Sequence, residues 1–308
     1  MELLIAAGIL VGGLVLLLKG ADFFVDGAET VGLSFGIPPF IIGVTIIAFG
    51  TSLPELASSV ASIYQGTSEI VLSGVLGSNI TNITLVLATV AVIGKNIPLD
   101  KNILRVDIPM LVISSLLLFF VASDRAISVI EAVLLLLSLV VFLVYSLQSN
   151  DGNTTAGAKA DWKAYALLVV GAVMVYFGAE WTIEGINKLS AIAGINQDIV
   201  GLSLLALATS LPELIVSIAA ARKGKTEIAV GNVLGSNVFN TYAVVGIARL
   251  FGDLKVTDNI VEFSLPFAVA ITIIFAFSCL SKGISRWEGL MYLLLYGFFL
   301  VDLFKGVM

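Results

Sequence analysis

The chain has 308 residues, of which 58% are hydrophobic and only 12% are charged, and its net charge is −6. Soluble domains carry roughly 25% charged residues, so this composition excludes a soluble enzyme and a disordered chain, and the acidic balance excludes a nucleic-acid binder. A membrane-spanning helix needs about 20 apolar residues, so the chain is predicted to be a polytopic membrane protein.

Apolar runs separated by short polar clusters predict ten transmembrane helices and an all-α fold. In chain order they cover residues 3–30, 38–63, 70–93, 104–122, 127–147, 163–189, 198–221, 228–251, 258–279 and 287–304. The longest polar interval, residues 148–162, follows the fifth segment and is too short for a regulatory domain. It separates two predicted five-helix repeats, residues 1–147 and 163–308.

Lys and Arg are unevenly distributed between the two predicted sides of the membrane. The side that holds both termini collects five of them, and the other side collects eleven. Cytoplasmic loops are enriched in Lys and Arg, so we expect both termini outside the cell and the linker 148–162 in the cytoplasm. The predicted location is the cell membrane, as a multi-pass protein.

The two halves repeat each other. A shift of 158 positions lays residues 43–87 on 201–245 without a gap, and 20 of the 45 aligned positions are identical. Chance similarity between apolar segments would match Leu and Val, whereas here Pro-Glu and Gly-Ser-Asn are matched. Five segments, an odd number, separate one copy from the next, so the copies enter the membrane from opposite sides. Such inverted repeats bind their substrates near the midplane, at the interface of the repeats.

One acidic residue lies in the middle of each repeated segment. These residues are Glu55 and Glu213. An ionised carboxylate at this depth is costly unless it is paired or bound to a cation, and the second, third and seventh segments contain no Lys or Arg in their interiors. Two negative charges without a fixed positive partner predict a mobile cation, and carboxylate oxygens suit hard ions such as Ca²⁺ or Na⁺.

A proline precedes each of these glutamates. Pro54 and Pro212 are predicted to break their helices, because proline lacks an N–H and clashes with the carbonyl group four residues earlier. The backbone oxygens of residues 48–51 and 206–209 are therefore expected to leave the helical ladder. Free carbonyl groups at membrane depth are tolerated where they line a cavity or bind an ion.

Helical spacing adds further oxygen atoms. Thr51 and Ser52 share a helix face with Glu55, and the same relation holds between the Ser-Asn pairs and Asn82 or Asn240. A single hydroxyl group more commonly bonds the backbone or a neighbouring helix. The two asparagines favour an ion site more strongly, because a carboxamide supplies an oxygen ligand without adding charge.

The motifs Gly-Thr-Ser-Leu-Pro-Glu at 50–55 and Ala-Thr-Ser-Leu-Pro-Glu at 208–213, with the two Gly-Ser-Asn segments, resemble the α-repeats of the cation/calcium antiporter superfamily, nearest its Na⁺/Ca²⁺ exchanger branch. The resemblance implies that Ca²⁺ is held by Glu55, Glu213, Thr51 and Thr209. It implies that Na⁺ is held by Glu55, Glu213, Ser52, Ser210, Ser78, Ser236, Asn82, Asn240 and the carbonyl oxygens of Ala48 and Ala206.

The chain departs from the family pattern at several points. Ala208 replaces the usual glycine of the second motif, which is expected to stiffen that turn. The matched positions of the two repeats are both asparagine, Asn82 and Asn240, whereas K⁺-dependent relatives carry an aspartate in the second repeat. K⁺ coupling is therefore not expected. The long regulatory loop of animal exchangers is absent between the halves.

A group of acidic residues lies outside the repeated motifs. Asp22, Asp26 and Glu29 lie late in the first segment, and Glu180 and Glu184 occupy similar positions in the sixth. We interpret them as solvated helix ends rather than as a cation entrance.

The sequence thus predicts a secondary antiporter and not an enzyme. Na⁺ and Ca²⁺ are expected to compete for one midplane site during alternating access, with the first and sixth segments moving, by the resemblance, across that site. No cofactor, nucleic acid or obligate protein partner is expected beyond the lipid bilayer and the two transported ions. Two alternatives stay open: protons as the counter-ion, because buried glutamates can titrate, and a cation channel through the same interior.

Overall fold

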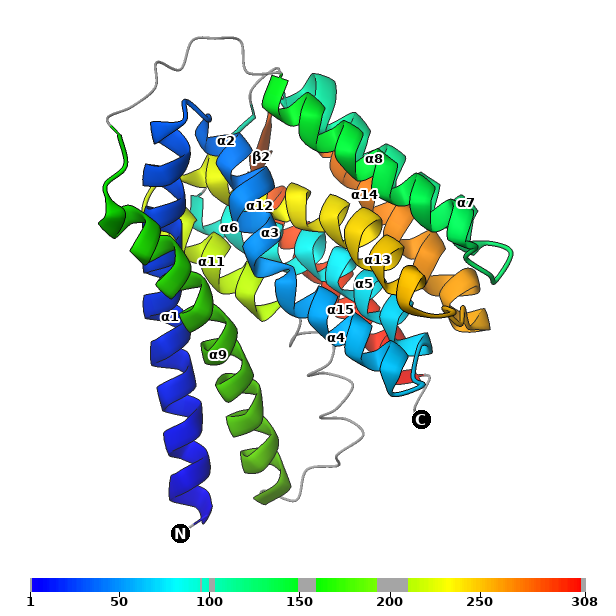
Figure 1. Cartoon of the computed structure of the whole chain (residues 1–308), viewed down its shortest axis with the longest axis horizontal. Coiled ribbons are helices and arrows are strands. Elements are labelled where there is room, and N and C mark those ends of the chain that lie inside the picture. The colour runs from blue at the N-terminus through cyan, green and yellow to red at the C-terminus, as the bar shows by residue number, and fades with distance from the viewer. Residues whose placement is uncertain (1, 95, 100–102, 149–158, 193–209, 306–308) are drawn as a thin grey trace.

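The computed structural model describes residues 2–94, 96–99, 103–148, 159–192 and 210–305, and this part of the chain is almost entirely helical (Figure 1). In chain order the helices are α1 (Glu2–Ser34), α2 (Pro39–Ile42), η1 (Gly43–Ile47), α3 (Ala48–Thr51), α4 (Leu53–Tyr64), α5 (Glu69–Thr81), η2 (Asn82–Leu87), α6 (Ala88–Gly94), η3 (Ile103–Asp107), α7 (Ile108–Ala122), α8 (Val129–Gln148), α9 (Trp162–Ile192), α11 (Leu211–Arg222), α12 (Thr226–Phe239), η4 (Asn240–Val244), α13 (Val245–Phe251), η5 (Ile260–Ser264), α14 (Leu265–Cys279) and α15 (Arg286–Lys305), where η marks a π-helical segment.

The helices follow the predicted segments closely. Nine of the ten segments coincide, within a few residues at each end, with one helix or a short series of helical elements in the described part of the chain. Only the end of the seventh segment, 198–221, is described, as α11. Among the described residues, seven stretches of 20 to 33 residues are long and apolar enough to cross a membrane. These observations support the prediction of an all-α polytopic fold.

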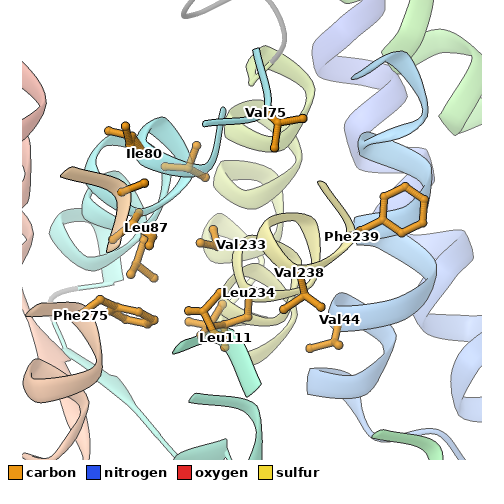
Figure 2. Packing of buried hydrophobic residues seen from close by; sticks show 14 of the residues in the cluster. Val44, Val75, Ile80, Leu87, Leu111, Val233, Leu234, Val238, Phe239 and Phe275 are labelled. Atoms are coloured by element: carbon orange, nitrogen blue, oxygen red, sulfur yellow. The ribbon is translucent and has the colours of Figure 1, made fainter. Parts of the chain in front are cut away.

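The centre of the molecule is α12. Every residue of this helix from Ile228 to Phe239 is buried, as expected for a helix that is enclosed on all sides. Figure 2 shows Val233, Leu234 and Val238 of α12 packed among Leu111 and other buried side chains. The core of the fold therefore surrounds the helix that carries the second Gly-Ser-Asn motif.

The outer helices expose apolar side chains instead. On α8, for example, Ile130 is 82% exposed and Leu137 is 58% exposed. A large apolar outer surface is unusual for a soluble monomer and is the surface that a lipid bilayer would cover.

The helices α1 and α9 pack side by side with their backbones in close contact (Figure 1). Gly13, Gly20 and Gly27 are spaced seven residues apart on α1, and a Cβ atom at Gly13 would lie 2.5 Å from the backbone nitrogen of Thr182. A Cβ atom at Gly27 would likewise overlap the backbone of Leu168. Small residues at membrane-helix interfaces permit this close approach. Because the contact moves down α9 as it moves up α1, the two helices are antiparallel.

The glycine contacts that α9 makes with α1 are equivalent, after a shift of 158 residues, to those that α1 makes with α9. The glycines of α9 follow those of α1 by 158 residues, and they meet α1 as the pairs Gly171–Phe24, Gly178–Leu17 and Gly185–Leu10. Thr182 and Leu168, which face the α1 glycines, themselves follow Phe24 and Leu10 by 158 residues. Each of these contacts is still present when every residue is replaced by its counterpart 158 positions away, which indicates a two-fold relation between α1 and α9. Because the two helices are antiparallel, the two-fold axis must be perpendicular to them, as expected for an inverted repeat.

The short connections pair within one predicted side of the membrane. Strands β1 (Asn96–Pro98) and β2 (Gly283–Ser285) form a two-stranded antiparallel sheet, and both follow segments that end on the predicted cytoplasmic side. A separate bridge joins Ala126 to Lys255, which both lie on the predicted outer side. These pairings agree with the predicted grouping of the loops.

Candidate functional site

Glu55 and Glu213 occupy equivalent positions in the first turns of α4 and α11. Both side chains are inaccessible to solvent, with 3% of Glu55 and none of Glu213 exposed. The Ser52 hydroxyl, one turn before Glu55, donates a hydrogen bond of 3.2 Å to Oε1 of Glu213. The two carboxylates also interact electrostatically, so the fold brings the two predicted acids into one site.

The backbone is broken just before each glutamate. Ser52 (φ −90°, ψ 2°) separates α3 from α4, and Ser210 has nearly the same dihedral angles (φ −92°, ψ 3°) before α11. Pro54 and Pro212 lie in the first turns of the new helices, where the missing N–H is tolerated. Pro54 therefore starts the helix that follows α3 rather than kinks a continuous one, and Pro212 lies at the same position at the start of α11.

The broken ladder at the first motif is only partly repaired. Ala48 O accepts the N–H of Ser52 at 3.0 Å and lies 3.3 Å from the Thr51 hydroxyl oxygen. Ser52 O accepts the N–H of Leu56 at 3.2 Å. The Ala48 carbonyl, a predicted Na⁺ ligand, is thus already engaged in this structure, whereas Pro54 has no N–H to offer Gly50 O.

Neither buried glutamate has a basic partner among the described residues. Every ion pair in that part of the chain lies elsewhere, such as Arg125 with Asp258 and Lys188 with Glu184. The described residues contain no group of three or more His, Cys, Asp or Glu side chains able to hold a metal ion. The site is therefore a pair of carboxylates among neutral oxygen atoms.

Several polar atoms of the predicted site are buried without a hydrogen-bond partner among the described residues. They are Oε1 and Oε2 of Glu55, Oε2 of Glu213, Oγ of Ser210, Oδ1 of Asn82, and Oδ1 and Nδ2 of Asn240. Buried polar groups are almost always satisfied, and each exception costs on the order of 1–3 kcal/mol, more for a charged group. A bound cation would satisfy the oxygen atoms and balance the two charges together.

Asn82 and Asn240 each begin a π-helical segment, η2 and η4, and both are fully buried. Single π-helical turns are often found at functional sites because they redirect side chains. The predicted ligands Ser78 and Ser236, which precede them on α5 and α12, are also buried. The sequence predicted these residues but gave no sign of the π-helical turns.

The two Gly-Ser-Asn segments contact each other directly. Asn79 Nδ2 donates to Asn237 O at 3.4 Å, and Asn237 Nδ2 donates to Asn79 O at 3.1 Å. The two residues are 158 positions apart and bond each other in the same way, so the pair obeys the two-fold relation seen between α1 and α9. Asn237 Oδ1 also accepts the Asn82 amide at 3.0 Å.

Thr51 is fully buried and reaches the second half of the chain. Its hydroxyl donates to Oδ1 of Asn232 at 3.1 Å and lies 3.4 Å from Oγ of Ser236. Asn232 was not predicted as a site residue, because the repeat aligns it with Gly74, so it is not among the positions at which the two halves match. The difference between the two halves was the signal that could have found it.

Three residues of the second motif are not placed. The predicted Ca²⁺ ligand Thr209, the predicted Na⁺ ligand Ala206 and the departure at Ala208 lie outside the described residues.

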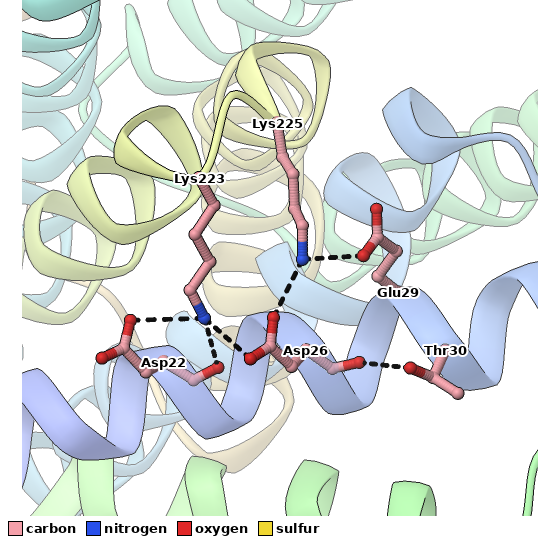
Figure 3. Close-up of polar contacts among 6 residues, drawn as sticks. All are labelled: Asp22, Asp26, Glu29, Thr30, Lys223 and Lys225. Atoms are coloured by element: carbon pink, nitrogen blue, oxygen red, sulfur yellow. Dashed lines mark hydrogen bonds and ion pairs between the residues drawn. The ribbon is translucent and has the colours of Figure 1, made fainter.

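The acidic residues of α1 are partly exposed, as we interpreted them, but they are also ion-paired, which the sequence did not indicate (Figure 3). Lys223 Nζ lies 3.3 Å from Asp22 and 2.8 Å from Asp26, and Lys225 Nζ lies 2.9 Å from Asp26 and 2.7 Å from Glu29. Partial burial alone would lower the pKa of Lys225, but its hydrogen bonds with Glu29 and Asp26 outweigh this effect and raise its pKa above the ordinary value. These five residues, hereafter the α1 ion-pair network, join α1 to the turn between α11 and α12.

Two buried carboxylates without a basic partner among the described residues, set among neutral oxygen atoms inside a polytopic bundle, are the arrangement expected of a membrane protein that binds hard cations in its interior. A family sequence model described as "Sodium/calcium exchanger protein" matches residues 5–148 and 163–305. The chain belongs to this family.

Named relatives and solved structures agree with this membership. The chain is 33% identical to sodium/calcium exchanger MaX1 of Methanosarcina acetivorans, over 96% of this chain and 97% of that protein. It is also 33% identical to the putative antiporter CaxA of Alkalimonas amylolytica, over 80% of this chain and 81% of that protein.

Among solved structures, the chain resembles the sodium-calcium exchanger NCX_Mj. For the structure soaked with zero Na⁺ and Ca²⁺ the TM-score is 0.87 at 30% identity, over 98% of this chain and 99% of that one. For the structure soaked with 2.5 mM Na⁺ and 0.1 mM Ca²⁺ the TM-score is 0.84 at 31% identity, over 95% and 96% of the two chains. The predicted fold class and family resemblance are confirmed.

Proposed function

We propose that this protein is a secondary antiporter that exchanges Na⁺ for Ca²⁺ across a cell membrane. The observation that carries the proposal is the pair of buried carboxylates, Glu55 and Glu213, whose unpartnered oxygen atoms have no basic residue beside them among the described residues. The names of the relatives MaX1 and NCX_Mj, both sodium/calcium exchangers, and membership of the family support the choice of ions.

Competition for the carboxylates couples the two ions. One Ca²⁺ would neutralise Glu55 and Glu213 and take further oxygen ligands from Thr51 and Thr209. Na⁺ ions would use the same glutamates together with the hydroxyl, amide and carbonyl groups assigned above. Because each ion set needs both carboxylates, the two sets exclude each other, and transport of one ion opposite to the other follows. A ligand shifts a conformational equilibrium only through different affinities for the two states, which the two ion sets provide.

Alternating access would move α1 and α9 together. Their glycine contacts bring the two backbones too close for either helix to move far without the other. The site lies on α4, α11 and the central helices, so a sliding α1–α9 pair would open it to one side at a time. The α1 ion-pair network would hold one end position of this movement. Its counterparts in the other half, Gln65 and Thr67, are uncharged, so the two end positions would differ in energy.

The topology proposed for this mechanism has two inverted repeats, residues 1–147 and 163–308, joined by the linker 148–162. Both termini face outward, and the linker faces the cytoplasm. The pairing of loops within each predicted side and the exchange of contacts between α1 and α9 support it.

The test is counter-ion-dependent Ca²⁺ uptake by the purified protein in proteoliposomes. Vesicles loaded with Na⁺ should accumulate Ca²⁺ when diluted into Na⁺-free buffer, whereas vesicles with a pH gradient or with no gradient should not. Uptake driven by the pH gradient alone would identify a proton antiporter. Ca²⁺ flux that needs no counter-ion would identify a channel, and either result would contradict the proposal.

A further inference from the structure

Asn232 marks a point at which the two halves of the site differ. It lies on α12, is fully buried, and stands 158 residues after Gly74, which has no side chain to play the same part. Burial of an amide is costly unless its polar atoms are bonded, so its partners indicate what it does.

The amide of Asn232 bridges three elements of the site. Its Oδ1 accepts the hydroxyl of Thr51 at 3.1 Å, at the very end of α3, and the hydroxyl of Ser236 at 3.5 Å. Its Nδ2 donates to Oγ of Ser217 on α11 at 3.0 Å. Ser217 lies four residues after Glu213, on the same face of α11. One side chain therefore connects the break before Glu55 with the helix that carries Glu213.

From these contacts we propose that Asn232 is a positioning residue of the ion site, which acts through Thr51 and favours Ca²⁺ binding over Na⁺ binding. The inference rests on the proposed function and on the assignment of Thr51 to the Ca²⁺ ligands. Thr51 ends a helix at a break where the backbone ladder is incomplete, so its carbonyl group needs a fixed direction from elsewhere. The hydrogen bond from its hydroxyl to Asn232 supplies that direction.

The hydrogen bond between Thr51 and Asn232 restrains one half of the site in a way that the repeat does not reproduce in the other half. The Thr51 end of α3 is bonded to α12 through Asn232, whereas Gly74, at the equivalent position of the first half, has no side chain that could make such a bond. A divalent ion that must gather several oxygen ligands at fixed distances depends on site rigidity. The Na⁺ ligands assigned above include Ser236, whose hydroxyl lies 3.5 Å from Asn232 Oδ1, but not Thr51, whose contact is shorter at 3.1 Å. Na⁺ binding should therefore depend less on Asn232 than Ca²⁺ binding does.

The experiment measures the KM for Ca²⁺ and the half-saturating Na⁺ concentration in proteoliposomes for Asn232→Ala. Loss of one buried hydrogen bond should raise the Ca²⁺ KM about tenfold and change the Na⁺ value about twofold or less. Thr272→Val is the matched control, because the Thr272 hydroxyl is also buried but bonds only the carbonyl group of Ala268 within its own helix. It should change neither value.

A double-mutant cycle decides whether Asn232 acts through Thr51. Thr51→Val removes the hydroxyl and keeps the backbone carbonyl, so the double variant should have about the same Ca²⁺ KM as either single variant. Independent, multiplying effects would overturn the proposal, as would equal losses for both ions or no loss at all. Asn232→Ser, whose hydroxyl ends short of the amide oxygen, carries the same expectation if Asn232→Ala does not fold.

A binding measurement separates this proposal from the proposed function. Calorimetric titration of the detergent-purified protein with Ca²⁺ alone should show the same tenfold weakening in Asn232→Ala, without reference to transport. If the wild type binds Ca²⁺ but does not exchange it for Na⁺, the proposed function fails. If it exchanges ions and Asn232→Ala binds Ca²⁺ normally, only the present inference fails.

Discussion

The α1 ion-pair network gives a measurable bias to the conformational equilibrium. Its four contacts join the movable helix α1 to the turn between α11 and α12, at distances of 2.7 to 3.3 Å. Partly exposed ion pairs contribute about 0.2–1 kcal/mol each, so four of them should favour the described arrangement by about 1–4 kcal/mol. At about tenfold for each 1.4 kcal/mol, that energy corresponds to about a 5- to 700-fold ratio of populations.

Replacement of both lysines, Lys223→Gln with Lys225→Gln, should remove this bias and leave three acidic side chains that repel one another. Spin labels at the exposed positions Phe35 and Leu280 would report the separation of α1 from the rest of the bundle. The intrinsic cysteine, Cys279, is buried and should not compete for the label. We expect the double variant to populate a second distance that is minor in the otherwise wild-type protein.

Two controls make the measurement specific. Lys188→Gln breaks an ion pair with Glu184 inside α9, which links no separate elements, and should leave the distances unchanged. Salt near 1 M shortens the Debye length to about 3 Å, so it should shift the wild type toward the double variant and leave the double variant unaffected. Identical distance distributions for wild type and double variant at low salt would refute the reasoning.

Two further predictions concern packing and Na⁺ binding. Gly178→Ala places a methyl group against the backbone of Leu17 and should lower the melting temperature or prevent folding. The control Gly8→Ala, with nothing within 4 Å of the added carbon, should be neutral or stabilise α1 by up to about 1 kcal/mol. Equal melting temperatures for the two variants would contradict the close contact of α1 and α9. Asn240→Leu removes a buried amide that has no partner among the described residues, and it should raise the half-saturating Na⁺ concentration severalfold without lowering the melting temperature. A much lower melting temperature with an unchanged half-saturating Na⁺ concentration would show a structural role instead.

Much of the fold could be predicted because the bilayer constrains it so strongly. Helix length and apolarity gave segment boundaries within a few residues, and the repeated Pro-Glu motif identified the helix break at Ser52 and the helix start after Ser210. The same repeat extends to the glycines of α1 and α9, but their flanking residues differ, so residue identity alone did not reveal it. The contacts in the structure, such as that of Gly13 with Thr182, show that α1 and α9 are equivalent helices, which the aligned sequences do not show.

The features that were missed are those that depend on long-range partners. Asp22 and Asp26 look like ordinary solvated acids in the sequence, because Lys223 follows them by about 200 positions and only the fold brings it near. Asn232 was missed for the opposite reason: it breaks the repeat that located its neighbours. The π-helical turns at Asn82 and Asn240 also left no periodic signal, because these segments are buried on nearly all sides and so have no polar face whose position an extra residue could shift.

The most direct test of the central claim is Ca²⁺ uptake driven by a Na⁺ gradient in proteoliposomes that contain Glu55→Gln. A unit charge at 4 Å contributes about 4 kcal/mol at an effective dielectric constant near 20, so the loss of one carboxylate beside a divalent ion should weaken Ca²⁺ binding by about a thousandfold or more. Glu180→Gln, on the exposed surface of α9, serves as the matched control and should transport normally. The account predicts no Na⁺-driven uptake by folded Glu55→Gln, and uptake at the wild-type rate would contradict it.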